Sequence, residues 1–399
     1  MPHAPRRPLR VAFLTNFVSP YRRPVFEDLA RTAGWDFRVF VNSESEFDRS
    51  WSVDVSRLQV VRSRNWAIRR RLKHEVPLPF TQVVTTHVPI GLYGDLRRFR
   101  PDVIVSSELG PRTMVASAYA RLNRTPLLIW SYHSRKSGLE GGRRDGLRRR
   151  LLRGCDAAIG MGVQAREVLR GWGVEDERIF DAPNAADHAS LAAAMRSDGF
   201  DARVSKKRAI VAPGKRVALV VGNLIPRKGI APLLEAWGQL SAELRDGWRL
   251  VFLGDGPLKP LLEAAGDDVY HAGFVAPEEM AEWYGLADLH VFPTLMDVWG
   301  LVVNESMACG VPTLCSVHAG CSDDLIDDGS NGLLFDPTAD GGALAGLERA
   351  LGHNDLAALG RRSVETAAAF TVERLATSFR TAVDALLGRA EPSDLRRAA

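Results

Sequence analysis

The sequence predicts an α/β fold of two doubly wound domains with parallel sheets, which face one another across a cleft. Short apolar segments alternate with helical patterns along the chain, an order typical of parallel sheets covered by helices. The length of 399 residues suits two domains, since a domain usually has ~100–200 residues. The alternation fails once, over the polar residues 196–216, which predicts a linker there.

The first domain is expected over residues 1–195, where each apolar run predicts a strand and each one-sided apolar pattern a helix. The strands are Leu9–Thr15, Phe37–Val41, Gln59–Val61, Val103–Ser106, Pro126–Trp130 and Ala157–Ile159, and the helices are Pro24–Ala33, Thr113–Leu122 and Arg143–Leu152. Pro24 suits the first helical position, where its missing N–H costs nothing.

The second domain is expected over residues 217–371, and a helical segment over about 372–399 is a candidate for packing back on the first domain. The strands are Val217–Gly222, Trp248–Leu253, Tyr270–Phe274, Leu289–Phe292 and Thr313–Ser316, and the helices are Ala231–Leu240, Glu278–Tyr284 and Val302–Cys309. Gly310 ends the last of these helices. Ligands in such sheets bind at the carboxyl ends of strands, so we expect the site in the cleft.

Composition excludes several classes of protein. No apolar run reaches the ~18 residues of a membrane-spanning helix, and the apolar stretch after the basic N-terminus is too short for a signal peptide. We therefore expect a cytoplasmic protein. The four cysteines form no C-x-x-C pair, and we interpret them as small apolar residues of a reduced protein. They are Cys155, Cys309, Cys315 and Cys321.

Positive charge is concentrated in the first half of the chain. Residues 1–199 hold 33 Lys and Arg against 21 Asp and Glu, whereas the remainder holds 19 against 27. Two clusters stand out, namely Arg69, Arg70, Arg71 and Lys73, and Arg143, Arg144, Arg148, Arg149, Arg150 and Arg153. An ordinary solvated face and an anionic membrane surface both fit this pattern. No nucleic-acid-binding motif accompanies the clusters, so nucleic acid is not the expected partner.

Three loops of the second domain follow predicted strands and are candidates for binding a ligand. Residues 222–229 contain Asn223, Arg227 and Lys228, whose cations suit a phosphate, but they do not match a Walker A loop. Gly254 starts a short Gly-Asp-Gly-Pro loop, which is a weak signal by itself.

The third loop is the most informative. Asp297 follows a strand, and Glu305 lies eight positions later inside the next helix. The helix N-terminus offers free N–H groups to an anion, while the carboxylates can accept hydrogen bonds from sugar or ribose hydroxyls. An N-terminal Asp and a surface Glu, as on any helix, would give the same spacing.

Together these loops resemble the retaining glycosyltransferases of family 4, which have the GT-B fold of two Rossmann-like domains. Asp297 and Glu305 resemble the family's E-x7-E motif with Asp in the first place. The segment GLVVNESMACGVPTL at 300–314, with its continuation to Gly332, is the most specific part of the match. The sequence PNAAD at 183–187 resembles the family's P-N-G-V-D, and LIWSYH at 128–133 resembles the strand that ends in its cleft His.

The resemblance implies a role for each matching residue. Glu305 would hold the donor ribose, Asp297 the donor sugar and Lys228 the diphosphate, and His133 would lie beside the sugar. The amides after Trp299, those of Gly300, Leu301 and Val302, would face the phosphates, and Phe274 and Val275 would flank the base. The donor would be a UDP- or GDP-sugar, with no metal and no cofactor, and the acceptor a glycan or a lipid-linked glycan.

Two departures from the family pattern affect particular roles. Asn223 stands where the family usually has Arg, so half of the phosphate clamp is missing, and Arg227 is the candidate to compensate. The family's Gly-Gly loop is replaced by residues 19–24, where Tyr21 and Arg22 could contact an anionic acceptor or simply begin a helix.

The sequence therefore predicts a retaining, metal-independent glycosyltransferase of polysaccharide, lipopolysaccharide or other glycoconjugate biosynthesis. No second carboxylate can be assigned as a covalent nucleophile, so attack from the front face is favoured, with cations and amides stabilising the leaving diphosphate. Two alternatives remain open at this point. One is a sugar-nucleotide epimerase or hydrolase of the same architecture, and the other is a non-catalytic partner that binds a sugar nucleotide or glycan.

Overall fold

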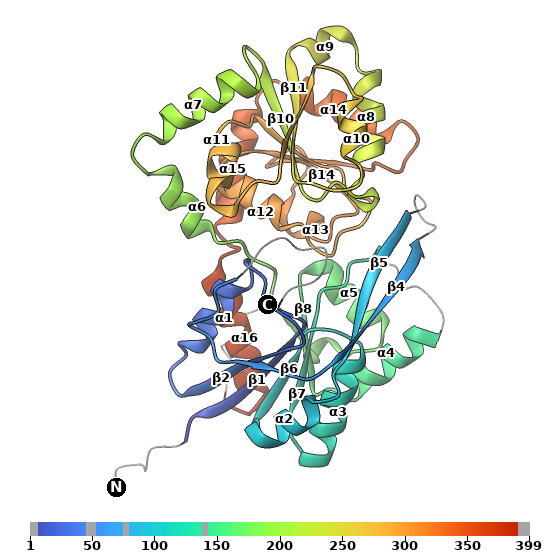
Figure 1. Ribbon diagram of the computed structural model, residues 1–399, viewed down its shortest axis with the longest axis vertical. Helices are drawn as coiled ribbons and strands as arrows, with labels where there is room; N and C mark the ends of the chain where they lie inside the picture. The colour runs from blue at the N-terminus through green and yellow to red at the C-terminus, as the bar shows by residue number, and fades with distance from the viewer. Residues whose placement is uncertain (1–6, 45–52, 75–79, 138–142, 390–399) are drawn as a thin grey trace.

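The computed structural model describes residues 7–44, 53–74, 80–137 and 143–389, which form two α/β domains, one above the other in Figure 1. Each domain is built on one sheet whose neighbouring strands are all parallel. The predicted fold class is confirmed. Buried strands such as β1 (Leu9–Thr15) are apolar along most of their length because helices cover both faces of the sheet.

The sheet of the N-terminal domain has the strand order β3-β2-β1-β6-β7-β8-β9. Besides β1 it contains β2 (Trp35–Val41), β3 (Val60–Arg62), β6 (Val103–Ser106), β7 (Leu127–Ser131), β8 (Ala157–Gly160) and β9 (Ile179–Asp181). Its helices are α1 (Arg23–Ala30), α2 (Leu92–Phe99), α3 (Pro111–Asn123), α4 (Arg143–Arg153) and α5 (Val163–Gly171), with the 3-10 turn η1 (Asp176–Arg178). The order reverses between β1 and β6, and such reversal points are where ligands bind in open α/β sheets.

The sheet of the C-terminal domain has the order β12-β11-β10-β13-β14-β15. Its strands are β10 (Arg216–Val221), β11 (Trp248–Leu253), β12 (Val269–Gly273), β13 (Leu289–Phe292), β14 (Thr313–Ser316) and β15 (Leu333–Phe335). Its helices and 3-10 turns are η2 (Pro226–Lys228), α8 (Ile230–Gln239), α9 (Ala242–Asp246), α10 (Lys259–Glu263), η3 (Pro277–Glu279), α11 (Met280–Gly285), α12 (Leu301–Ala308), α13 (Ser322–Leu325), α14 (Gly342–Leu351) and α15 (Leu356–Ala367). The reversal here lies between β10 and β13.

The segment 196–216, expected to be a linker, contains a helix. α6 (His188–Met195) comes before it, and α7 (Phe200–Val211) lies inside it. α7 packs beside α11, and Arg208 Nη2 lies 2.6 Å from Asp288 Oδ2. The polar sequence that suggested a linker belongs to a helix with most of its surface in solvent.

The chain returns to the N-terminal domain at its end. α16 (Val372–Leu386), red in Figure 1, lies against the blue helix α1. Phe379 packs edge-on against Phe13 and Trp130, with ring centroids 5.7 and 5.0 Å away. Arg380 Nη1 lies 2.6 Å from Asp28 Oδ1. Residues 372–386 therefore complete the core of a domain whose first strand starts at residue 9.

A two-stranded antiparallel ribbon stands apart from both sheets. It consists of β4 (Trp66–His74) and β5 (Phe80–Val88), which pair along their whole length, and β5 lies next to η2. The exposed residues Arg69, Arg70 and Arg71 lie on β4, so the first basic cluster belongs to this ribbon and not to a helix or the main sheet. The side chains of Lys73, Arg143 and Arg144 are outside the described part of the structure.

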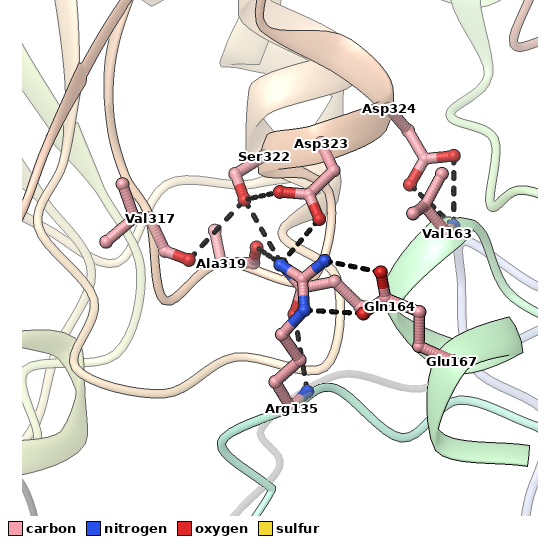
Figure 2. A network of polar contacts seen from close by, with 9 residues as sticks. All are labelled: Arg135, Val163, Gln164, Glu167, Val317, Ala319, Ser322, Asp323 and Asp324. Carbon is pink, nitrogen blue, oxygen red and sulfur yellow. Dashed lines mark hydrogen bonds and ion pairs between the residues drawn. The ribbon is translucent and has the colours of Figure 1, made fainter. Parts of the chain in front are cut away.

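Polar contacts join the two domains on the side of α5, as Figure 2 shows. Arg135 of the N-terminal domain lies 2.6 Å from Asp323 of α13 and 2.6 Å from Glu167 of α5. Asp323 is therefore paired with a cation from the other domain.

A second set of contacts surrounds the start of α5. Gln164 Nε2 donates to the carbonyl of Ala319 at 3.0 Å, and the N–H of Val163 donates to Asp324 Oδ2 at 3.0 Å. Burial raises the pKa of Asp324 to about 6, although the bond from Val163 opposes this rise. Gly162 has φ +85°, and a Cβ there would lie 2.4 Å from Asp324 Oδ2, so only glycine fits.

Candidate functional site

A cavity of about 270 Å³ lies between the domains, beyond the carboxyl ends of β7 and β13. Its lining residues are Tyr132, His133 and Ser137 from the N-terminal domain and Arg227, Met296, Asp297 and Val298 from the C-terminal domain. The structure thus brings together three of the predicted site residues, which are separated by up to 164 positions in the sequence.

Asp297 and two cations form the charged wall of this cavity. Lys228 Nζ lies 2.6 Å from Asp297 Oδ2, and Arg227 Nη1 lies 3.6 Å from the same oxygen. Burial alone would raise the pKa of Asp297, but the two cations outweigh it and lower the pKa to about 2. Asp297 is therefore ionised, and the cluster of three carries a net positive charge.

The N-terminus of α12 lies directly after this cluster. Trp299 N–H donates to Asp297 Oδ1 at 3.3 Å. Gly300 then caps the helix at φ +110°, and a Cβ there would lie 2.6 Å from the Phe292 ring. The glycine allows the helix start to pack on the end of β13. The first N–H groups of a helix have no partner inside it, so those of Leu301 and Val302 are not bonded within α12.

Glu305 lies one turn further along α12, where it contacts α11. Tyr284 is fully buried, and its hydroxyl donates to Glu305 Oε2 at 2.7 Å. Burial raises the pKa of Glu305 to about 7, while the bond from Tyr284 lowers it. Glu305 does not line the 270 Å³ cavity and points instead toward this tyrosine.

His133 lies on the opposite wall of the cavity. Its Nδ1 lies 2.9 Å from Ser131 Oγ, and its ring stacks on Tyr132 with centroids 6.2 Å apart. Burial lowers the pKa of His133 to about 3, and the nearby Arg148 acts in the same direction. The imidazole is therefore neutral at physiological pH.

The remaining candidates lie around the cavity without lining it. Asn223 and Gly254 lie in the loops after β10 and β11, where a Cβ on Gly254 would lie 2.1 Å from the Gly222 carbonyl. Phe274 and Val275 follow β12, and Phe274 is 57% exposed.

Trp299 takes part in a series of hydrogen bonds that connects α12 with the N-terminal domain. It is buried, and its Nε1 donates to Asn304 Oδ1 at 2.7 Å. Asn304 Nδ2 in turn donates to the carbonyl of Asn184 at 3.4 Å. The sequence PNAAD at 183–187 is thus linked to α12 across the domain boundary.

Two tyrosines near the site were not predicted from the sequence. Tyr284 contacts Glu305 from a different helix, and Tyr132 lines the cavity beside His133. Nothing in their local sequence pattern indicates these contacts, because both depend on how separate elements meet. Tyr21 and Arg22 lie just before α1, and Arg22 stacks on the Trp130 and Tyr132 rings.

The four cysteines are free thiols, and three of them are buried. Burial raises the pKa of Cys155 to about 12. Within the described ranges, no three His, Cys, Asp or Glu side chains are grouped to hold a metal ion. None of the described helices is both long and apolar enough to cross a bilayer.

Two family models match the chain and meet near the boundary of its domains. One, described as "Glycosyl transferase 4-like domain", matches residues 18–185, and the other, "Glycosyl transferases group 1", matches residues 202–362. The chain therefore belongs to the family 4-type glycosyltransferases, with the GT-B fold.

Individual relatives share part of the sequence. The chain is 28% identical to the sulfoquinovosyl transferase SQD2 of Arabidopsis thaliana over 65% of its own length and 52% of that protein. It is 30% identical to a GDP-mannose-dependent alpha-mannosyltransferase of Corynebacterium glutamicum over 46% of its length and 41% of that protein. The matched region thus spans about half the length of these curated relatives.

Solved structures support the fold. HepE from Anabaena, crystallised in complex with UDP, superimposes with a TM-score of 0.72 at 16% identity, over 94% of this chain and 100% of that one. A sucrose-phosphate synthase from Thermosynechococcus elongatus gives 0.71 at 18% identity, over 96% and 100%.

Proposed function

We propose that this protein transfers a sugar from a nucleotide diphosphate sugar to an acceptor hydroxyl, in the synthesis of a polysaccharide, lipopolysaccharide or other glycoconjugate. The observation that carries the proposal is the cluster of Asp297, Lys228 and Arg227 at the N-terminus of α12, facing His133 across the cavity. Cations and helix amides suit a diphosphate, and the carboxylate suits sugar hydroxyls.

The donor would lie mainly on the C-terminal domain. Lys228 and Arg227 would bind the diphosphate together with the first amides of α12, and Arg227 would supply the charge that Asn223 lacks. Asp297 would accept bonds from the sugar and Glu305 from the ribose. The complexes of Anabaena HepE with UDP and with UDP-glucose support a UDP-sugar as the first donor to test.

The reaction would proceed with retention and without a metal ion. Charge would grow on the diphosphate as the anomeric bond breaks, and Lys228, Arg227 and the α12 amides would stabilise it. Neutral His133 can donate or accept a hydrogen bond beside the sugar. The acceptor hydroxyl would attack the anomeric carbon from the face that the leaving group vacates. The departing phosphate would take the proton of that hydroxyl.

Two substitutions test the site. Glu305→Ala and Lys228→Ala should each lower kcat/KM for the donor by roughly tenfold to a hundredfold, because each removes a hydrogen bond to or from a charged group worth about 1.5–3 kcal/mol. Glu263→Ala and Lys259→Ala are matched controls, since this exposed pair lies on α10. Full activity of both site variants would refute the assignment. Rapid donor hydrolysis or epimerisation without acceptor would favour the hydrolase or epimerase alternative.

We also propose that the protein binds an anionic membrane surface, which would bring it to a lipid-linked acceptor. Arg69, Arg70 and Arg71 are exposed on β4 of the ribbon, and Trp66 at the start of the same strand is 66% exposed. Such polybasic segments attract anionic lipids in a salt-dependent way. Flotation with anionic liposomes at low and high salt tests this, and binding that is absent or insensitive to salt would refute it.

A further inference from the structure

Arg22 has no acidic partner among the described residues. Its Nη1 donates to Thr15 Oγ1 at 3.3 Å, a long bond to a neutral hydroxyl. Its guanidinium lies 4.7 Å from the centroid of the Trp130 ring and 5.1 Å from that of Tyr132. The two rings hold the side chain in place, while its charge is not neutralised by a carboxylate.

The nearby carboxylate of Glu108 is committed to another arginine. Arg112 is 1% exposed, and its Nη2 lies 3.1 Å from Glu108 Oε2. Its Nη1 donates to Asn16 Oδ1 at 2.9 Å, but its Nε has no hydrogen-bond partner in the described structure. The two arginines and one glutamate therefore leave a net positive charge at the ends of β1 and β6.

This charge lies beside the cavity between the domains. Thr15 ends β1, beside the reversal of strand order, and Tyr132, under Arg22, lines the cavity that contains Asp297. Ser19, in the turn before α1, is buried, and its hydroxyl lacks a partner among the described residues. The segment just before α1 thus has an oriented cation and a buried hydroxyl that has no partner among the described residues.

We infer that Arg22 binds an oxyanion carried by the acceptor, either a phosphate or a carboxylate. The inference rests on the proposed function, in which Lys228 and Arg227 on the opposite wall take the donor diphosphate. An arginine fork can bind both oxygens of such a group, and the flanking aromatic rings limit the entropy lost on binding. The enzyme would then prefer acidic acceptors over their neutral analogues.

Anion binding to the nucleotide-loaded protein tests this directly. The protein is saturated with UDP, or with GDP if UDP does not bind, and titrated at constant ionic strength with inorganic phosphate and, separately, with acetate. We expect at least one of these anions to raise the Tm of the wild type and of Arg23→Gln, but not that of Arg22→Gln. Arg23 is a matched control, because it is the next residue and faces Glu27 at 3.8 Å.

Turnover provides the second measurement. For pairs of acceptors with and without a phosphate or carboxylate, Arg22→Gln should reduce the preference for the acidic member by about tenfold or more, with an unchanged KM for the donor. Arg22→Lys should recover only part of the preference, because it keeps the charge but loses the fork.

The alternatives give different results. The inference is overturned if neither anion raises the Tm of the wild type, or if the anion raises the Tm of the wild type, Arg23→Gln and Arg22→Gln equally. An anion that competes with the nucleotide, or an Arg22→Gln variant whose donor KM rises, assigns Arg22 to the donor instead. If no nucleotide binds at all, the proposed function fails, while the anion titration of the free protein still decides whether Arg22 is an oxyanion site.

Discussion

Glu305 is the residue whose charge is most sensitive to its surroundings. Its pKa of about 7 results from burial, which is only partly offset by the hydroxyl of Tyr284. Because the folded-state pKa is raised above the ordinary 4.5, the stability linked to this group is present below pH 4.5 and is lost as the pH rises through 7. The ionised side chain is thus held at a cost in the free energy of folding.

The raised pKa of Glu305 predicts that donor binding depends on pH. A carboxylate accepts hydrogen bonds from ribose better than a carboxylic acid, so donor affinity should rise between pH 6 and pH 8. Asp297 and His133 do not titrate in this range. Glu305→Gln should bind the donor weakly at every pH, and it should have a higher Tm than the wild type at pH 8. Titration calorimetry and thermal unfolding check both results, and an unchanged pH profile in the variant would contradict the assignment.

Tyr284 should set the midpoint of that profile. Its hydrogen bond stabilises the charged form of Glu305, so Tyr284→Phe should raise the pKa of Glu305 and move the profile to higher pH. If Tyr284→Phe lowered activity equally at pH 6 and pH 9 and left the midpoint of the profile unchanged, its effect would come from a disturbed structure and not from the pKa of Glu305.

At the scale of elements, the strands were the most predictable part. The predicted bounds of β1, β6, β11, β13 and β14 agree with the structure, because a strand buried on both faces is a short apolar run with clear ends. The ribbon of β4 and β5 was not predicted. Its sequence lacks a continuous apolar run, and its arginines resemble any solvated surface.

The site was predictable to the extent that it is local in sequence. Arg227, Lys228 and Asp297 were proposed because they follow strands, and the structure places both cations within 4 Å of the Asp297 carboxylate. The contact of Tyr284 with Glu305 was not predictable, since it depends on how α11 meets α12. Short loops after strands are visible in a sequence, whereas contacts between helices are not.

The packing of α16 against the N-terminal domain predicts how a substitution in this helix changes the stability of that domain. Phe379→Ala should destabilise the N-terminal domain by about 3–5 kcal/mol, because it removes a buried aromatic ring between Phe13 and Trp130. Glu373→Gln is the control, since this residue is exposed on the same helix. Denaturant unfolding followed by tryptophan fluorescence measures the difference. An equal effect of the two substitutions would show that α16 adds little to that core.

At the scale of the whole molecule, the contact of Asp324 with α5 predicts a pH-dependent closure of the domains. The pKa of Asp324 is raised to about 6 when the contact is made, so its contribution to closure is present at low pH and is lost as the pH rises through 6. The radius of gyration in solution scattering should therefore increase between pH 5 and pH 7.

Asp324→Asn should remove this response, because an amide oxygen can still accept from Val163 but does not titrate. Asp328→Asn is the matched control, since Asp328 pairs with Arg349 within the C-terminal domain. An identical pH response of the wild type and Asp324→Asn would assign the change to other groups.

The order in which the chain is synthesised gives α16 a further consequence. The N-terminal half emerges from the ribosome first, yet the helix that covers Phe13 and Trp130 is translated only after the entire C-terminal domain. Until then the nascent protein exposes an apolar groove along α1 and β1, the kind of surface that chaperones bind and that promotes aggregation. A ribosome that stalls before residue 372 therefore leaves an incomplete first domain, however long that domain has had to fold.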